Sequence, residues 1–307
     1  MYSIEVKNLT KKFGAFTSVN DVSFAVKKGE IFGFLGANGA GKSTTIKMLC
    51  GILEPTSGDA LVGGHSIVSA PDKVKLNIGY MSQRFSLYDD LAVGENIDFF
   101  GGVYGLEGAT FKERKNWVLE ISNLKGKEKL LTGSLPGGVK QRLALGTAVI
   151  HRPSIVFLDE PTSGVDPLSR RNFWELIHEL SSGGTTVFVT THYLEEAEFC
   201  NNIILINAGK LIAEGDSKTL KSKYLDGSIY EIECSDPVKA MEILNHSKYI
   251  NDTSIFGNKI HISVSKNFSD ENLLRTDLQS QNIRIESIAP ITPTLEDVFI
   301  HLLEKGA

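Results

Sequence analysis

The distribution of apolar positions along the chain changes twice, and each change marks a different kind of predicted structure. The N-terminal part has short apolar runs typical of strands, residues 85–150 have mostly helical spacing, and apolar strand-like runs then alternate with helices up to residue 224. Runs such as Ile155-Val156-Phe157-Leu158 are apolar on both faces, so the pattern predicts an α/β fold with a buried, parallel core sheet. The predicted strands are 3–8, 22–26, 30–35, 155–158, 186–190 and 203–206, and the predicted helices include 93–104, 111–122 and 168–180.

A second set of elements follows Asp226-Gly227. Their order, β-α-β-β-α-β and then a last helix at 294–303, predicts a small ferredoxin-like α+β domain. We therefore predict two domains, residues 1–224 and 225–307; the second shows no catalytic motif, and a regulatory, dimer-stabilising or purely stabilising role stays open. The predicted strands are 228–234, 254–256, 259–264 and 283–288, and the helices before the last one are 237–244 and 271–281.

Composition narrows the possible partners. With 307 residues, 41% of them hydrophobic, the chain can bury two cores, and its net charge of −5 without a basic block predicts no nucleic-acid partner. Three scattered cysteines indicate reduced thiols in a cytoplasmic protein. We expect no signal peptide, and no apolar run approaches the ~20 residues needed to cross a bilayer. Any membrane role therefore requires a partner.

The strongest chemical signal is Gly-Ala-Asn-Gly-Ala-Gly-Lys-Ser-Thr at 36–44, which fits the phosphate-binding loop of nucleotide hydrolases and lies between a predicted strand and a helix. Glycines let the backbone curl so that its N–H groups can point at phosphate oxygens. Lys42 is predicted to reach the β- and γ-phosphates, and Ser43 to bind Mg²⁺. The predicted nucleotide-binding residues here are Gly36, Asn38, Gly39, Ala40, Gly41, Lys42, Ser43 and Thr44.

Asp159 and Glu160 follow the buried strand 155–158. Two carboxylates at the end of such a strand are costly unless a positive group meets them, and Mg²⁺ held between Ser43 and Asp159 would be that group. Glu160 is then free to deprotonate the attacking water. Without the upstream loop, capping of the next turn would explain both acids nearly as well.

The stretch Leu-Pro-Gly-Gly-Val-Lys-Gln-Arg at 135–142 resembles the signature motif of ATP-binding cassette (ABC) ATPases, whose usual form begins Leu-Ser-Gly-Gly; here Pro136 replaces the serine. Further motifs occur in the order of that family. Gln83 resembles its glutamine loop, Ser163-Gly164-Val165-Asp166 its dimer-contact loop, and His192 its switch histidine. The resemblance covers residues 2–224.

The resemblance implies a P-loop cassette with a mixed core sheet, an N-terminal antiparallel β subdomain and a helical subdomain at about 85–150. It implies ATP and Mg²⁺ as ligands. Phe13 would stack on adenine, with Phe16 as a rival and a core position as another possibility for Phe13. The implied catalytic residues are Glu160, His192, Lys42 and Gln83; the implied metal ligands are Ser43, Gln83 and Asp159; the implied nucleotide contacts outside the phosphate loop are Phe13, Gln83, Leu135, Pro136, Gly137, Gly138 and Asp166.

In such ATPases two subunits meet head to tail, and ATP lies between one phosphate loop and the other signature motif. The resemblance thus implies a second ATPase subunit, identical or closely related, and separately encoded membrane-spanning permease subunits at the cytoplasmic face of the membrane. The stretch Pro-Thr-Leu-Glu-Asp-Val-Phe at 293–299 is similar to the terminus of ATPases of drug exporters, which favours export. The transported substrate is not implied.

Other classes stay open. Soluble ABC ATPases of ribosomes or chromosomes carry two cassettes or long coiled-coil inserts, whereas this chain has one cassette and a modest helical insert. A P-loop GTPase or kinase would leave the stretch 135–142 unexplained, and the guanine-reading Asn-Lys-x-Asp is absent. Pro136 raises the further possibility of a weakly hydrolysing regulatory subunit, against which Glu160 and His192 argue.

Overall fold

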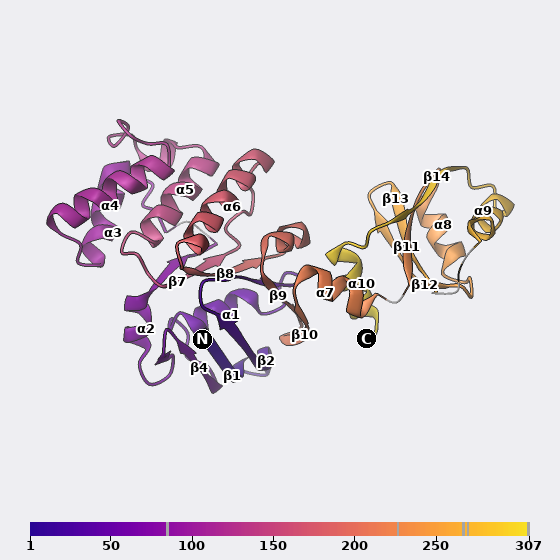
Figure 1. Ribbon diagram of the computed structural model, residues 1–307, viewed down its shortest axis with the longest axis horizontal. Helices are drawn as coiled ribbons and strands as arrows, with labels where there is room; N and C mark the ends of the chain where they lie inside the picture. The colour runs from indigo at the N-terminus through magenta and orange to yellow at the C-terminus, as the bar shows by residue number, and fades with distance from the viewer. Residues whose placement is uncertain (84–85, 226, 266–267, 269, 306–307) are drawn as a thin grey trace. The chain divides into compact units, whose positions relative to one another are not determined.

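The computed structural model describes residues 1–83, 86–225, 227–265, 268 and 270–305 (Figure 1). The chain forms two compact units, Met1–Glu214 and Gly215–Ala307. The division lies earlier than the boundary at residue 224 expected from the sequence. Helix α7 (Ser217–Tyr224) packs on α10 (Leu295–Lys305) of the second unit, and its Leu220 is fully buried. The helix therefore belongs to the second unit and not to the first.

A mixed six-stranded sheet forms the centre of the first unit. Its middle strands pair in parallel, and β3 (Ile31–Leu35) is buried along its whole length, as its uniformly apolar sequence predicts. The last strand follows a two-residue turn at Ala208 and Gly209, both with positive φ, which suits a tight hairpin. In spatial order the strands are β10 (Lys210–Gly215), β9 (Asn202–Asn207), β3, β8 (Thr186–Thr191), β7 (Ile155–Asp159) and β6 (Ile78–Met81).

A smaller antiparallel sheet has the strand order β2-β1-β4-β5. The hairpin of its two long strands is longer than the predicted 3–8 and 22–26, because pairing continues past register shifts and the positive φ of Asn8 until Phe13 faces Phe16 at the tip. This places aromatic side chains at the end of the hairpin. The strands are β1 (Tyr2–Phe13), β2 (Phe16–Lys27), β4 (Ser57–Val62) and β5 (His65–Ser66).

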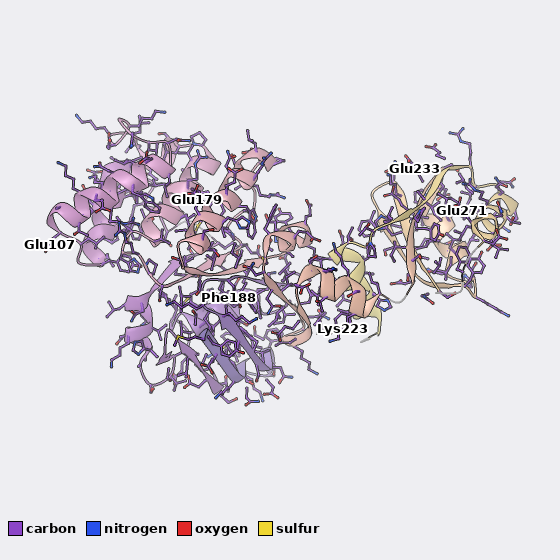
Figure 2. All side chains as sticks on the ribbon, viewed as in Figure 1. Glu107, Glu179, Phe188, Lys223, Glu233 and Glu271 are labelled. Carbon is purple, nitrogen blue, oxygen red and sulfur yellow. The ribbon has the colours of Figure 1, made fainter. Side chains whose placement is uncertain are left out.

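Helices cover both faces of the six-stranded sheet. Figure 1 shows α1 and the antiparallel sheet on one side, and α5 and α6 on the other. On the α1 side, aromatic rings from three strands pack on Phe188, which lies in the interior of this unit (Figure 2). The elements are α1 (Lys42–Leu49), α2 (Pro71–Asn77), α3 (Val93–Val103), α4 (Gly108–Ile121), α5 (Gly137–Ala148), α6 (Pro167–Ser182), and two 3-10 helices, η1 (Thr132–Ser134) and η2 (Leu194–Phe199).

Helices α3, α4 and α5 share a separate apolar core that includes Val93, Ile97, Val118 and Leu143. This confirms the helical subdomain, whose predicted first residue, 85, lies outside the described residues. Among the described residues, none of the helices combines the length and the apolar character that a membrane span requires.

The second unit has a four-stranded antiparallel sheet in the order β12-β13-β11-β14. Together with its two intervening helices, this is the predicted ferredoxin-like arrangement. An apolar core joins the sheet to α8 and α9. The elements are β11 (Ser228–Cys234), α8 (Pro237–Leu244), β12 (Ile250–Phe256), β13 (Lys259–Val264), α9 (Glu271–Ser280), β14 (Ile285–Ile291) and α10.

A buried histidine ties α10 to this sheet. Nδ1 of His261 on β13 lies 2.9 Å from Oδ1 of Asp297 on α10, and its Nε2 lies 3.4 Å from Glu231. Burial lowers the pKa of His261, but the hydrogen bonds and charges of Asp297 and then Glu231 outweigh it, and the net pKa is raised above 6.5. Burial raises the pKa of Asp297, but the hydrogen bonds from His261 and Thr294 outweigh this effect, and the net pKa is lowered below 3.8.

We expect the second unit to lose stability as the pH rises above 6.5. A raised histidine pKa stabilises the folded state below the unfolded value, and this contribution disappears as the pH passes the folded value; the Asp297 contribution is lost only on acidification below about 3.8. Pulse proteolysis across a urea series at pH 5.5 and pH 8.5 measures this difference. His261→Gln should reduce the difference in stability between the two pH values, whereas His246→Gln, at an exposed histidine of the same unit, should leave it unchanged. The same pH dependence of stability in both variants would contradict the assignment.

Candidate functional site

A cavity of about 620 Å³ lies in the first unit beside the N-terminus of α1. Six residues of the predicted phosphate loop line it: Asn38, Gly39, Gly41, Lys42, Ser43 and Thr44. Gln83, Glu160 and His192, from three distant parts of the sequence, line it as well. The volume is within the range of small-molecule sites, about 300–1,000 Å³.

The phosphate loop can have only glycine at the positions where its backbone passes closest to its neighbours. A Cβ on Gly36 would lie 2.2 Å from the carbonyl oxygen of Ile206, and one on Gly41, whose φ is 105°, would lie 2.5 Å from that of Ser18. The chain then enters α1 at Lys42, and the first N–H groups of a helix have no intrahelical partner. The loop therefore presents free N–H donors and the positive end of a helix dipole, which fits a phosphate group.

Lys42 is 4% exposed, and its ammonium group is surrounded by acceptors. Nζ donates to the carbonyl oxygens of Gly36 at 2.9 Å and Ala37 at 3.2 Å, and it lies 3.1 Å from Oε1 of Glu160. The ammonium is thus held inside the loop, next to the N-terminus of α1.

Three side chains that line the cavity contact the carboxylate of Glu160. Glu160 follows β7 with a φ of 47°, unusual for a residue with a side chain, and its N–H is bonded to Thr190. Gln83 Nε2 donates to Oε2 of Glu160, and His192 Nδ1 lies beside the same oxygen, both at 3.1 Å. With Lys42 on Oε1, the other three predicted catalytic residues all contact the carboxylate of Glu160, which is 7% exposed.

Asp159 lies beside Ser43. The Ser43 hydroxyl donates to Asp159 Oδ1 at 3.0 Å, and the Thr190 hydroxyl donates to the same atom at 2.8 Å. Burial raises the pKa of Asp159 against the lowering by these two hydrogen bonds. A hydroxyl and a carboxylate are the hard oxygen ligands that Mg²⁺ prefers. Among the described residues no group of three or more His, Cys, Asp or Glu side chains is placed to hold a metal ion.

Sequence reasoning missed Thr190, although a signal for it was present. Thr190 is the residue that pairs with Asp159 in the parallel register of β7 and β8. A hydroxyl at the matching position of the neighbouring strand could therefore have been expected to contact the carboxylate.

At the tip of the β1–β2 hairpin, the structure brings Phe16 into the lining of the cavity and not Phe13. Both rings are exposed, Phe13 by 50% and Phe16 by 62%. The ammonium of Lys11 lies 5.3 Å from the centre of the Phe13 ring. The geometry therefore favours Phe16, the rival in the sequence interpretation, as the ring nearer a nucleotide in this chain.

The residues of the stretch 135–138 do not line the cavity of their own chain. Leu135 is buried in the helical subdomain, Pro136 is the N-cap residue of α5, and Gly137 and Gly138 begin that helix. Asp166 likewise lies outside the cavity, where its side chain caps α6 by accepting the N–H of Ser169 at 2.9 Å. In this chain alone, these residues are therefore not part of the cavity.

Comparison with known proteins gives matches over both units. A family model described as "ABC transporter" matches residues 19–163, and one described as "ATP-binding protein DrrA1-3-like, C-terminal domain" matches 215–303, beginning at the first residue of the second unit. A further model, of an "AAA domain, putative AbiEii toxin, Type IV TA system", matches 133–196.

Curated relatives extend the comparison to the whole chain. The "Linearmycin resistance ATP-binding protein LnrL" of Bacillus subtilis is 36% identical over 303 residues, which cover 97% of each chain. The "Probable multidrug ABC transporter ATP-binding protein YbhF" of Escherichia coli is 54% identical over 220 residues, 72% of this chain but only 38% of the relative's length.

A solved structure matches the first unit. It is described as "Dimeric structure of a post-hydrolysis state of the ATP-binding cassette MJ0796 bound to ADP and Pi". Its TM-score is 0.64 at 26% identity, covering 69% of this chain and 98% of the solved chain. The fold and the sequence therefore match the same kind of protein.

Proposed function

This chain belongs to the ATP-binding proteins of ABC transporters, a family of ATPases, and from that premise we propose that it hydrolyses MgATP in the cavity around Glu160 to power export through separate membrane subunits. The observation that carries the proposal is the contact of Lys42, Gln83 and His192 with the single buried carboxylate of Glu160, just after β7.

In this proposal Glu160 is the general base. Its two oxygens face a lysine, an amide and an imidazole, so the carboxylate is oriented before a water molecule arrives. Binding of the triphosphate would draw the Lys42 ammonium group towards the β- and γ-phosphates. A phosphate carries more negative charge than the carbonyl oxygens that Lys42 contacts in the structure. Glu160 would then be free to accept a proton, and His192 would remain beside it to orient the attacked phosphate.

Mg²⁺ would be held by Ser43 and Asp159, with Gln83 near enough to the same cavity to contribute, and when bound it would neutralise charge on the phosphates. Thr190 would fix the orientation of Asp159 through its hydroxyl.

A second cassette would complete the site. Gly137 and Gly138 lie at the start of α5, so their N–H groups and the helix dipole are available to an anion outside their own chain. We propose that they, with Leu135, Pro136 and Asp166, contact ATP bound to the opposite subunit, which is identical or closely related. The solved dimeric cassette named above supports this arrangement.

Asp89, which follows Gln83 in the sequence, contacts Lys140 of α5 and Gly133 just before that helix. These contacts could couple a partner bound near Asp89 to the start of α5. Lys140 Nζ lies 2.9 Å from Oδ1 of Asp89, and Gly133 donates its N–H to the Asp89 carbonyl oxygen at 2.9 Å. We propose that permease subunits dock near Asp89, at the cytoplasmic face of the membrane, and that docking moves the signature stretch 135–138 through these contacts. The names of the relatives, multidrug transport and linearmycin resistance, support export.

The proposal is tested by purifying the chain with the membrane proteins encoded beside its gene and measuring phosphate release. We expect saturable hydrolysis of ATP that needs Mg²⁺ and rises when the permease is present in lipid. An ATP-binding chain that copurifies with no membrane protein and acts on ribosomes would contradict the transport role. Absence of hydrolysis in the assembled complex would contradict the catalytic role.

Pro136→Ser should strengthen the ATP-bound dimer. Proline has neither a hydroxyl nor an N–H, whereas serine could hydrogen-bond the γ-phosphate across the interface, a contact of about 1.5–3 kcal/mol. The measurement is the MgATP concentration that half-dimerises the Glu160→Gln background, with Pro136→Ala as the control that removes the ring without adding a hydroxyl. Equal or weaker dimerisation with serine would show that the loop is adapted to proline.

A further inference from the structure

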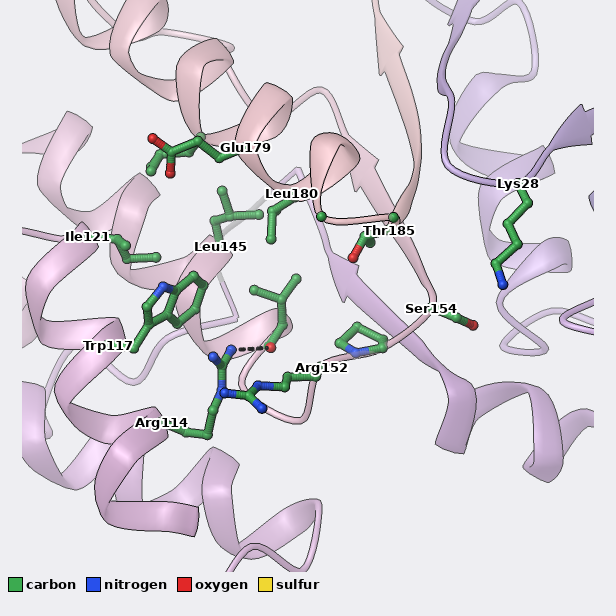
Figure 3. Close-up of a pocket in the computed structure, with 15 residues that line it drawn as sticks. Lys28, Arg114, Trp117, Ile121, Leu145, Arg152, Ser154, Glu179, Leu180 and Thr185 are labelled. Carbon is green, nitrogen blue, oxygen red and sulfur yellow. Dashed lines mark hydrogen bonds between the residues drawn. The ribbon is translucent and has the colours of Figure 1, made fainter. Parts of the chain in front are cut away.

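A second cavity, of about 460 Å³, lies in the first unit and shares no lining residue with the nucleotide cavity. Its walls come from α4 and α5 of the helical subdomain on one side, and from α6 and the segments that precede β7 and β8 on the other (Figure 3). Its volume is again within the range of small-molecule sites.

One end of this cavity is apolar. Figure 3 shows Trp117, Ile121, Leu145 and Leu180 gathered around the same space, from α4, α5 and α6. The apolar end is therefore suited to an apolar group of a ligand.

A buried cation lies at the other end. Arg114 is 7% exposed, and its guanidinium group lies against Trp117, with Cζ 4.1 Å from the ring. Nε donates to the carbonyl oxygen of Ile150 at 2.8 Å and Nη2 to that of Val149 at 3.0 Å. A guanidinium has five N–H donors, and these two contacts use only part of that donor set.

The charges around this end are mostly positive. Arg152 lies beside Arg114 (Figure 3); it is paired with Glu113, and both side chains of that pair are 64% exposed. Burial and the neighbouring charge of Arg152 lower the pKa of Arg114, as expected for two cations side by side. Lys28 also lines the cavity. Glu179, the one acidic residue in the described lining, is exposed and lies near the apolar side chains, away from the two arginines. An anion between the arginines would relieve their repulsion.

We propose that this cavity binds an amphipathic organic anion, with its apolar body against Trp117, Ile121, Leu145 and Leu180 and its carboxylate or similar group on Arg114 and Arg152. A planar guanidinium matches a carboxylate in a bidentate contact, and the buried position of Arg114 makes that contact stronger than on the surface. The ligand would touch both the helical subdomain and the core, and so would hold the two together.

The probe for this site is decanoate, titrated by calorimetry into the full chain without nucleotide, so that the result does not depend on ATP hydrolysis. We expect one decanoate per chain, and at least tenfold weaker binding of 1-decanol and of decyltrimethylammonium, which have the same chain without the negative charge. Arg152→Gln should weaken decanoate binding at least tenfold, whereas Arg171→Gln, at an exposed arginine of α6 outside the cavity, should not.

Leu180→Trp fills the apolar end and should abolish binding of decanoate with little change in the melting temperature. If that variant does not fold, the proposal is still tested by Arg152→Gln and by the comparison of decanoate with 1-decanol and decyltrimethylammonium. Equal affinity for decanoate and decanol, unchanged binding by Arg152→Gln, or binding of several decanoates per chain to the surface would each overturn the proposal.

Discussion

Glu160→Gln should lower the rate of ATP hydrolysis by about 10²–10⁴-fold, the usual cost of removing a general base. Glutamine keeps the shape of the side chain and can still meet Gln83 and His192, but it cannot accept the proton of the attacking water. In the structure Glu160 also lies 3.1 Å from Lys42 and so competes with phosphate for that ammonium group. We therefore expect the variant to bind ATP at least as tightly as the wild type.

Single-turnover phosphate release and an equilibrium ATP titration measure the two effects separately. The matched control is Glu195→Gln, which removes one exposed acid from η2, close in sequence to His192 but outside the cavity. Turnover by the Glu160 variant within a few-fold of the wild type would show that another group activates the water.

Lys42→Ala should weaken ATP binding by about 10- to 100-fold, which corresponds to the 1.5–3 kcal/mol of one hydrogen bond to a charged group. Among the described lining residues, Lys42 is the one lysine or arginine, and its ammonium group is held by the carbonyl oxygens of Gly36 and Ala37. Alanine would also leave the buried carboxylate of Glu160 without its ion-pair partner, so a loss of stability is expected in addition.

Lys47→Ala is the matched control for this change, because Lys47 lies exposed on the same helix α1. Calorimetric titration with MgATP compares the two variants, and thermal unfolding without nucleotide records the stability. An unchanged dissociation constant for Lys42→Ala would remove the phosphate-loop assignment.

Local patterns were sufficient to predict much of the fold. The strands 228–234 and 259–264 and the helix 237–244 agree with β11, β13 and α8 because each has a clear period between turn residues. The predicted strands of the β1–β2 hairpin are too short because the pairing near the tip is irregular, and only cross-strand pairing keeps Lys11 and Lys12 in the sheet.

The candidate site shows the same division between local and long-range information. The phosphate loop was predictable because its glycines, lysine and serine are contiguous. That Lys42, Gln83 and His192 all reach Glu160 depends on contacts 32 to 118 positions apart, which the resemblance suggested in order but not in geometry. The choice between Phe13 and Phe16 depended on the direction of side chains at a hairpin tip, which a single sequence does not encode in any local pattern.

The most direct test of the account is the molecular mass in solution of the Glu160→Gln chain, measured by sedimentation equilibrium with and without MgATP. If two cassettes enclose ATP between one phosphate loop and the opposite stretch 135–138, the chain should change from monomer to dimer on saturation with MgATP. It should return to monomer when Gly137, where an added Cβ meets no atom of its own chain within 4 Å, is replaced by aspartate. A chain that binds MgATP fully and remains a monomer at every protein concentration would contradict a site shared between two subunits.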